Sequence, residues 1–488
     1  MIKSNLSKDA IRGESFAPQV NLSVPNEEIY NYPEKVLQFG TGVLLRGLCD
    51  YFIDKANKQG VFIGRIVIVK STDKGDSSEF QNQNGLFTHC IKGVENGEII
   101  EEFIVNASVS RTLSASKEWN AILDCAQNPE MQVIISNTTE VGIQLVADDL
   151  ISGNPPKSFP VKLLAFLHHR WKHFNGSPES GMVIIPTELI IDNGDTLQEI
   201  VLEQAHRNGL EPEFIDWIDK HNHFCNSLVD RIVPGKPDEQ ITQKTLDLLG
   251  YQDKLLIMSE SYSLWAIQGD DFVKEKLSFA QVNPGVVITP NIDSYRELKL
   301  RLLNGTHTLM CGMAYLLGFR LVKDVMANGY LGRLVTNLML GELALAIPYK
   351  MDSKTADRFG RSVLDRFRNP FINHKLIDIT VQYTTKMRMR NVPILFQYYR
   401  EFGKAPELFA MGFAAYLQFM HVVKVENGKF YGESNGEYYP INCDFANYFH
   451  EAWKTGELDL KKVLSDKTLW GEDLNQLAGF NEAISKYI

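Results

Sequence analysis

The segment KLRLLNGTH, residues 299–307, combines an amine, an amide and an imidazole on one predicted helix. Asn304 and His307 are three residues apart and therefore share a face of that helix. Lys299 and His307 are expected about 80° apart at 3.6 residues per turn. A lysine amine can act as acid and base when burial or neighbouring cations lower its pKa, and an amide can stabilise a developing alkoxide. The spacing predicts a site for reversible hydride transfer to a ketone; a solvated polar helix face would have the same pattern.

A glycine-containing segment, FGTGVLLRG at residues 39–47, follows the short apolar run KVLQF. Gly40 and Gly42 would form a tight turn and admit a pyrophosphate beside the N–H groups of the following helix. Leu45 stands where the third glycine of a GxGxxG fingerprint is expected. We predict that this degenerate fingerprint binds a dinucleotide through Gly40, Thr41, Gly42, Val43 and Leu44. The alternative is an ordinary glycine turn between a strand and a helix.

The end of the next predicted strand, GRIVIVKST, would select the cofactor. The carboxylate of Asp73 could bind the adenosine ribose of NAD. Lys70, Ser71 and Thr72 would equally suit the ribose phosphate of NADP, so the residues alone leave the choice open.

A polar segment, SNTTEVG at residues 136–142, follows another predicted strand. Ligands bind at the carboxyl edge of a parallel sheet. We therefore predict that Thr138, Thr139 and Glu140 face the cofactor cleft; the alternative is a polar helix cap.

Three basic residues, Lys386, Arg388 and Arg390, alternate in the segment KMRMRN at residues 386–391. Alternation at every second position would place all three on one side of an extended stretch. Arginine matches the planar geometry of a carboxylate, so this segment is a candidate for holding an acidic substrate. A solvated basic loop would have the same composition.

Two histidines, His169 and His173, have the i,i+4 spacing of a metal pair, but no glutamate follows His169. The six cysteines form no CxxC pair. The sequence therefore predicts no catalytic metal, and the histidine pair is more typical of an exposed basic helix face.

Short apolar runs alternate with helical patterns through the first part of the chain. KVLQF, GRIVIV, MQVIIS and GMVIIP are typical of buried strands, and FPVKLLAFLHHRWKHF is typical of a helix between them. This alternation predicts an α/β, Rossmann-like domain with a mostly parallel sheet over residues 1–285. Long amphipathic patterns then predict an all-helical C-terminal domain over residues 290–488, with the boundary in residues 283–291.

The chain has 488 residues and a formal net charge of -10. An acidic balance argues against binding to a nucleic acid backbone. The N-terminus shows no apolar signal sequence, and the longest apolar stretch, residues 309–319, is too short to cross a bilayer. We expect a cytoplasmic protein, monomeric or a small homo-oligomer, that binds a small molecule and no membrane.

The ordered motifs resemble those of the zinc-independent long-chain mannitol dehydrogenase family. KLRLLNGTH matches its K-x4-N-G-x-H signature, FGTGVLLRG its GxG segment and NTTEVG its T-x-TE-x-G turn. LVDRIVP (228–234), SESYSLWAI (259–267) and RFRNP (366–370) resemble further family motifs. The resemblance implies a metal-free dehydrogenase that uses NAD. It also implies these roles: Lys299 as the acid–base residue, Asn304 and His307 as ligands of the reacting oxygen, and Asp230 in the network that supports the substrate.

The sequence departs from the mannitol-oxidising members at two places. Their CDN segment, whose asparagine helps to bind the oxyanion, is replaced by PTELIIDNG, in which Glu188 precedes Asn193. An acidic residue three before the lysine is replaced by Arg296, which would suit a substrate carboxylate. Both changes argue against mannitol as the substrate.

Within the family, the segments RGLCDYFIDKANKQG, GRIVIVKST and LVDRIVPGKP are most similar to members that act on sugar acids. This implies a substrate derived from a hexuronate. The alternatives are a reductase for an isomeric sugar acid and a polyol or polyol-phosphate dehydrogenase. A non-catalytic NAD-binding sensor, from a different class, would not need Lys299 as a proton donor.

Overall fold

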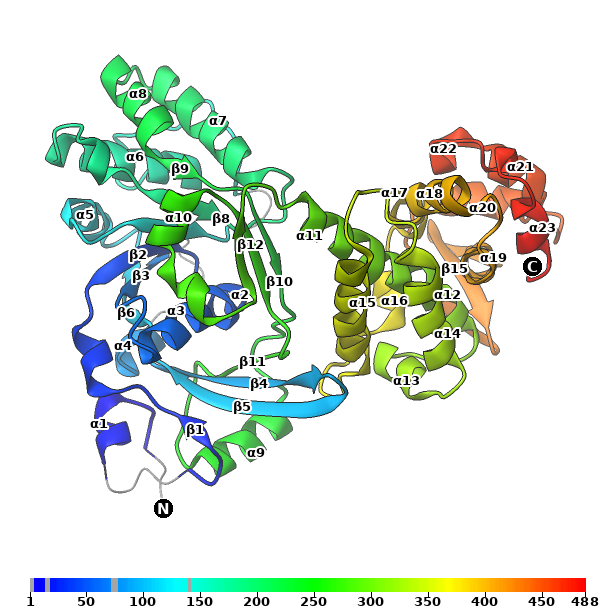
Figure 1. Cartoon of the computed structure of the whole chain (residues 1–488), viewed down its shortest axis with the longest axis horizontal. Coiled ribbons are helices and arrows are strands. Elements are labelled where there is room, and N and C mark those ends of the chain that lie inside the picture. The colour runs from blue at the N-terminus through cyan, green and yellow to red at the C-terminus, as the bar shows by residue number, and fades with distance from the viewer. Residues whose placement is uncertain (1–3, 14–17, 72–77, 139–141) are drawn as a thin grey trace. The chain divides into compact units, whose positions relative to one another are not determined.

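The computed structural model describes residues 4–13, 18–71, 78–138 and 142–488. The chain forms two compact units (Figure 1). The first comprises residues 1–92 and 100–292, and the second comprises residues 93–99 and 293–488.

A six-stranded sheet lies at the centre of the first unit, in the order β6–β3–β2–β7–β8–β9. Every pair of neighbours in it is parallel, which confirms the predicted Rossmann-like sheet. Its strands are β2 (Glu34–Phe39), β3 (Arg65–Lys70), β6 (Val109–Ser114), β7 (Val133–Ser136), β8 (Val183–Pro186) and β9 (His223–Phe224).

Both faces of this sheet are covered. Successive side chains of a strand point to opposite faces, so neighbouring residues pack against different helices. Leu37 and Ile134 pack on one face against helices α5 (Trp119–Asp124), α6 (Phe159–His173), α7 (Asn193–Arg207) and α8 (Pro212–His221) (Figure 1). Val36 and Val133 pack on the other face with Phe52 of α3. The helix after β2 is divided at Leu48 into α2 (Val43–Gly47) and α3 (Cys49–Lys58).

Two smaller sheets lie mainly in the first unit. One has the order β1–β5–β4–β11, and the other has the order β10–β12–β13, in which β12 is antiparallel to β10 and parallel to β13. The segment predicted as a domain boundary therefore contains a paired strand. The bounds are β1 (Leu22–Ser23), β4 (Phe87–Glu95), β5 (Glu98–Asn106), β10 (Ser227–Asp230), β11 (Ile257–Ser259), β12 (Leu264–Gln268) and β13 (Val286–Thr289), with helices α1 (Lys8–Arg12), α4 (Ser78–Asn82), α9 (Glu239–Leu249) and α10 (Asp271–Lys276).

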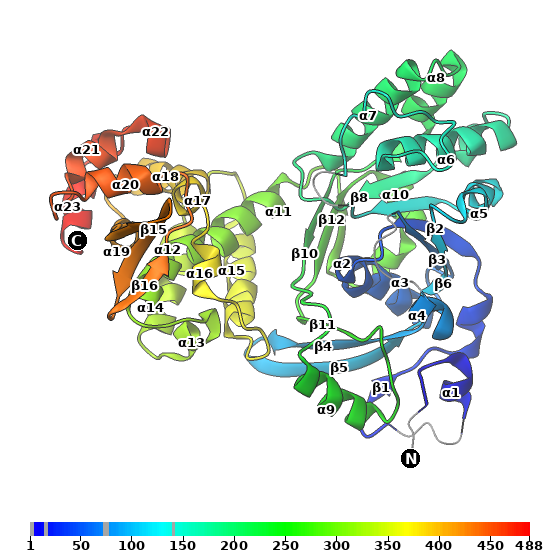
Figure 2. The same cartoon turned by 180° about the vertical axis from the view of Figure 1, so that it is seen from behind.

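The second unit is built mainly of helices, as predicted, and is seen from behind in Figure 2. Gly412 allows α12 and α19 to approach closely, because a Cβ there would lie 2.8 Å from the carbonyl oxygen of Leu309. The helices are α11 (Asp293–Leu298), α12 (Thr306–Leu316), α13 (Val322–Ala327), α14 (Leu331–Asn337), α15 (Ser353–Arg368), α16 (Leu376–Ile379), α17 (Tyr383–Arg390), α18 (Val392–Phe402), α19 (Glu407–Phe419), α20 (Ala446–Ala452), α21 (Leu460–Ser465), α22 (Lys467–Trp470) and α23 (Phe480–Ser485), with π-helices η5 (Lys299–Gly305) and η6 (Leu338–Leu343).

This unit also contains a three-stranded antiparallel sheet that the sequence analysis did not predict. Its strands are β14 (Lys424–Glu426), β15 (Lys429–Ser434) and β16 (Glu437–Pro440). The turns are Asn427–Gly428 and Asn435–Gly436, and all four of these residues have positive φ. Asn–Gly pairs favour two-residue hairpin turns for this reason. Across the described ranges, no helix is long and apolar enough to cross a membrane.

Candidate active site

Lys299 and Asn304 lie five residues apart in the π-helix η5, which joins α11 to α12. In an α-helix, side chains five residues apart would point about 140° away from each other. The i→i+5 hydrogen bonding of a π-helix adds a residue to the turn and so brings residues five apart toward the same side. The ideal α-helical angle predicted between Lys299 and His307 is therefore wrong, because one turn between them is wider than an α-turn.

The glycine of the NGxH segment is required by a close contact. A Cβ on Gly305 would lie 2.7 Å from the side-chain oxygen of Asn391. The amide nitrogen of Asn391 donates to the Gly305 carbonyl at 3.3 Å. Gly305 thus lets the end of α17 bind directly to the segment that carries Asn304.

His307 lies in the first turn of α12 and is 6% exposed. Its ring stacks on Phe367, with centroids 4.1 Å apart, and its Nε2 has no hydrogen-bond partner among the described residues. Burial lowers the pKa of His307 well below its ordinary value, so the imidazole is neutral near pH 7. Four basic side chains add to this shift by opposing a positive charge on the ring: His374, Arg366, Arg390 and Lys386.

The extended conformation predicted for KMRMRN is wrong, because this segment belongs to helix α17. The buried Tyr383, Met387 and Asn391 recur every four residues, a helical period that the alternation of basic residues obscured. On this helix Lys386 and Arg390 are i,i+4 neighbours on one face.

Arg388 lies on a different side of α17, where its Nη1 donates to the carbonyl of Thr468 at 3.3 Å. Lys386 Nζ donates to the Ile379 carbonyl at 3.0 Å. Arg390 Nη1 donates to Thr308 Oγ1 at 3.1 Å. Helix α17 therefore places Lys386 and Arg390 near His307, whereas Arg388 lies away from them.

Two side chains that the sequence analysis missed fix α17 against η5 and α12. The hydroxyl of Tyr383 donates to the Thr308 carbonyl at 2.8 Å and accepts from the Gly312 N–H at 3.0 Å. Nη1 of the buried Arg301 donates to the carbonyl of Arg390 at 2.9 Å and to that of the preceding residue at 2.6 Å. Neither role has a local sequence signal, because each joins elements far apart in the chain.

Two other predicted substrate residues lie elsewhere. Arg296, in α11, forms an ion pair with Asp293 at 2.8 Å. Asp230 ends β10 in the first unit and is 6% exposed.

In the first unit, the glycine turn after β2 has the geometry that a nucleotide turn needs. Gly40 has φ 135°, and a Cβ there would lie 3.0 Å from both the Asn137 carbonyl oxygen and Leu45 Cδ1. Leu45 therefore fills the space beneath the turn. No atom lies within 4 Å of the Cβ position of Gly42, which leaves room for a phosphate group to approach. Thr41, Val43 and Leu44 are half-buried beside it.

Glu188 organises the turn after β7. Its Oε1 accepts from the Thr138 N–H at 2.8 Å and from the Thr138 hydroxyl at 3.0 Å, and its Oε2 accepts from the Ser136 hydroxyl at 3.1 Å. Burial raises the pKa of Glu188 above its ordinary value. Thr138 is thus engaged by Glu188, which the sequence analysis noted only as a departure. Three predicted cofactor residues lie outside the described residues: Asp73, Thr139 and Glu140.

Asn193 is the first asparagine of the segment that replaces the CDN motif, and its side chain forms hydrogen bonds with backbone groups. Its Nδ2 donates to three carbonyls, those of Pro186, Glu188 and Ser227, at 3.0–3.1 Å. Its Oδ1 accepts from the Ser227 N–H at 2.8 Å. Asn193 is 1% exposed, so it stabilises the loop and has no donor left for an oxyanion.

The His169 and His173 rings each have another neighbour. His169 Nε2 lies 3.0 Å from the Gln127 side chain, and the His173 ring contacts Phe174 edge-on. Among the described residues, no group of three histidine, cysteine or carboxylate side chains is arranged to hold a metal ion.

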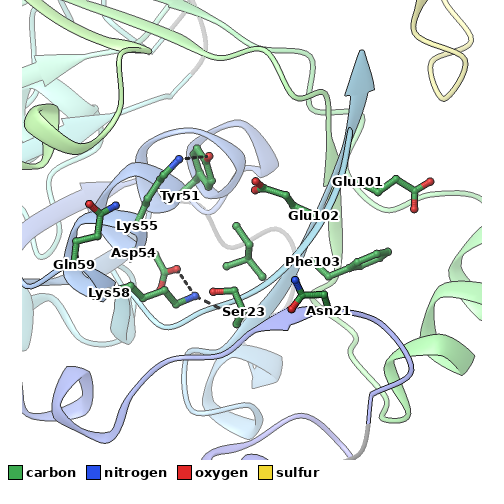
Figure 3. A pocket seen from close by; sticks show the side chains of 11 residues that line it. Asn21, Ser23, Tyr51, Asp54, Lys55, Lys58, Gln59, Glu101, Glu102 and Phe103 are labelled. Atoms are coloured by element: carbon green, nitrogen blue, oxygen red, sulfur yellow. Dashed lines mark hydrogen bonds and ion pairs between the residues drawn. The ribbon is translucent and has the colours of Figure 1, made fainter. Parts of the chain in front are cut away.

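A separate cavity of about 350 Å³ lies in the first unit between α3 and β5 (Figure 3). None of the predicted site residues lines it. Its Lys58 amine is already engaged by Asp54 at 2.8 Å and by the carbonyls of Val105 and Ser23. Its charges are of mixed sign, with Glu101 and Glu102 on the facing strand, so it does not have the chemistry of the predicted site.

Comparison with known proteins agrees with this architecture. Residues 34–281 match the family model of the mannitol dehydrogenase Rossmann domain, and residues 291–488 match that of the mannitol dehydrogenase C-terminal domain. An altronate oxidoreductase of Bacillus subtilis (strain 168) is 36% identical over 95% of this chain and 94% of its own length. One of Escherichia coli O7:K1 (strain IAI39 / ExPEC) is 34% identical over 93% of each chain.

Two solved structures share the fold. A substrate-free D-sorbitol dehydrogenase matches with a TM-score of 0.78 at 19% identity, covering 99% of this chain and 96% of that one. The Pseudomonas fluorescens mannitol 2-dehydrogenase, in a ternary complex with NAD and D-mannitol, matches with a TM-score of 0.68 at 21% identity and the same coverage. Together with the two family matches, these similarities show that the chain belongs to the mannitol dehydrogenase family.

Proposed function

We propose that this chain is an altronate oxidoreductase that interconverts D-altronate and D-tagaturonate with NAD. The relatives at 34–36% identity bear that name, and the similarity covers most of both chains. The observation that carries the proposal is the set of basic side chains around the neutral His307, beside Asn304. Such a site suits a substrate that brings its own negative charge.

Residues 1–285 are proposed to bind the nucleotide, and residues 290–488 to supply the catalytic groups. The free space at Gly42 and the positive-φ turn at Gly40 fit a dinucleotide. NAD is also the nucleotide in the mannitol 2-dehydrogenase structure. When bound, the nicotinamide supplies or accepts the hydride.

Lys299 is the proposed general acid and base. In the reducing direction its ammonium donates a proton to the ketone oxygen of tagaturonate as the carbon receives the hydride. The Asn304 amide and the neutral His307 ring hold the same oxygen and stabilise its developing charge. In the oxidising direction the lysine amine takes the hydroxyl proton of altronate, and the same two groups orient the hydroxyl.

The substrate carboxylate is assigned to Lys386 and Arg390. These two share a face of α17, and both charges act on the His307 ring. Arg388 bonds elsewhere, to Thr468, and Arg296 is paired with Asp293. The carboxylate and the ketone occupy different positions along the substrate chain, so separate groups can hold them.

The nearest alternative, a fructuronate reductase, would use the same chemistry on an isomeric acid. A mannitol-type polyol dehydrogenase would require fewer cations near His307, because its substrate is uncharged. A polyol-phosphate dehydrogenase would require a phosphate group on its substrate. A non-catalytic NAD-binding sensor would not need Lys299.

A panel of altronate, mannonate, mannitol and mannitol phosphate, each with NAD and NADP, tests the proposal. Altronate with NAD should give the highest kcat/KM, and a preference for another pair would replace the assignment.

A further inference from the structure

His374 lies in the loop between α15 and α16 and meets His307 edge-on. The two ring centroids are 4.8 Å apart and the ring planes are inclined by 84°. The backbone there is fixed, because the His374 carbonyl accepts from the Val322 N–H at 3.0 Å and the Leu376 N–H donates to the Arg320 carbonyl at 2.9 Å. The loop therefore holds the second imidazole at a constant place beside the first.

The His374 side chain, in contrast, makes no hydrogen bond within the part of the chain that the structure describes. Two other buried or half-buried histidines do have polar partners for their rings. His89 bonds to Ser259 at 2.7 Å, and His168 bonds to Glu211 at 3.0 Å. His374 is only half-buried, so its ring nitrogens remain open to an incoming molecule.

The charges around His374 favour an anion. Burial lowers its pKa, and Arg366 and Lys386 lower it further, while Asp378 opposes them. The ring is therefore neutral near pH 7 and carries one N–H donor. The imidazole of His307 is the fourth group that faces it. A neutral donor placed among cations stabilises a carboxylate without adding another charge that must be buried.

We propose that His374 donates a hydrogen bond to the carboxylate of the sugar-acid substrate and is a specificity residue for acids over hexitols. This inference rests on the proposed function, because it requires a carboxylate in the substrate. His307 and Asn304 are proposed to hold the reacting oxygen. His374 lies next to His307, and the charges of Lys386 and Arg366 act on both imidazoles. Lys386, Arg390 and His374 then hold the acidic end of the substrate and distinguish it from the ketone.

Paired substitutions separate hydrogen bonding from packing. His374→Phe keeps a ring against His307 but loses the donor, whereas His374→Asn and His374→Gln keep a donor near one or the other ring nitrogen. We expect His374→Phe to raise KM for altronate about tenfold or more, with a smaller change in kcat. One of the two amide variants should stay within a few-fold of wild type. His421→Phe, a half-buried ring stacked on Trp453, is the control and should be unchanged.

The opposite pattern overturns the inference. If His374→Phe binds altronate as wild type does, the ring acts only by packing. If both amide variants are as weak as His374→Phe, a hydrogen-bond donor at this place does not sustain binding, and the inference fails as well. The wild-type substrate panel separates this failure from that of the proposed function. A wild type that prefers mannonate fails the altronate assignment but leaves His374 testable on mannonate. A wild type that prefers mannitol fails both.

Discussion

The guanidinium of Arg390 donates a hydrogen bond to the Thr308 hydroxyl, one residue beyond His307. This bond, 3.1 Å long, connects the basic face of α17 to the helix that carries the proposed catalytic histidine. The Thr308 hydroxyl in turn donates to the Asn304 carbonyl at 2.8 Å. The group proposed to hold the carboxylate and the groups proposed to hold the ketone are therefore parts of one hydrogen-bonded arrangement.

Replacing Lys386 or Arg390 should weaken binding of the acid. A charge-assisted hydrogen bond contributes roughly 1.5–3 kcal/mol, so Lys386→Gln and Arg390→Gln should each raise KM for altronate about ten- to a hundredfold. Arg388→Gln is the matched control on the same helix and should leave KM unchanged. Steady-state kinetics on the three variants test this, and a larger effect at Arg388 than at the other two would contradict the assignment.

Removing the Lys299 amine should abolish most turnover. Loss of general acid–base catalysis lowers the rate about 10²–10⁴-fold, so kcat of Lys299→Ala should fall by that factor. NAD binding, measured by calorimetry, should persist. Lys354→Ala, at an exposed position of α15, should behave as wild type. A Lys299→Ala enzyme that keeps more than roughly half of the turnover would show that the proton comes from another group.

Stability should depend on pH through Asp50. This carboxyl group is fully buried, neither of its oxygens has a hydrogen-bond partner among the described residues, and burial raises its pKa to about 7. The folded state therefore holds a proton that the unfolded state releases near pH 4. The resulting stabilisation is complete below that pH and is lost as the pH rises through about 7.

Asp50→Asn removes this dependence. At pH 8.5 the variant should be more stable than wild type, by at most about 4 kcal/mol, and at pH 4.5 the difference should shrink. Thermal unfolding at both pH values measures it. Asp9→Asn, whose side chain is 96% exposed, should show no such difference. Equal melting temperatures of Asp50→Asn and wild type at pH 8.5 would mean that Asp50 is neutral or hydrated throughout.

NAD should give a higher kcat/KM than NADP. The site that discriminates between them follows β3, where Lys70 is the last residue of the strand. If NADP proves the better cofactor, Lys70→Ala should then lose that advantage selectively, which would identify the lysine as a phosphate ligand.

Prolonged treatment with EDTA should leave activity unchanged. The proposed chemistry uses the lysine amine where zinc enzymes use a metal to polarise the carbonyl. Loss of activity that added zinc restores would replace the lysine mechanism with a metal-dependent one.

Much of this architecture could be predicted from local patterns. The β-branched runs between helices indicated the parallel sheet, and NGxH located the segment around Asn304. The conformation of that segment could not be predicted, because composition does not distinguish a π-turn from an α-turn. His374 and Arg301 also escaped notice, since their partners come from distant elements.

Other features had a signal that was not used. Asn427–Gly428 and Asn435–Gly436 are the usual sequence of a tight hairpin, but the surrounding helical patterns dominated the prediction. In α17 the basic residues suggested a period of two, while Tyr383 and Met387 carried the helical one. In both cases the weaker pattern identified the structure, because it reflected the backbone and the core.

The π-helix makes the spacing between Lys299 and Asn304 as important as their chemistry. An α-helix that gains one residue without lengthening acquires a turn of this kind. If the same residues formed an ordinary α-helix, Lys299 would point about 140° away from Asn304 instead of toward the same side. The amine and the amide therefore meet because of the backbone conformation of η5, and a change that restored α-helical hydrogen bonding there would separate them while leaving both side chains in the sequence.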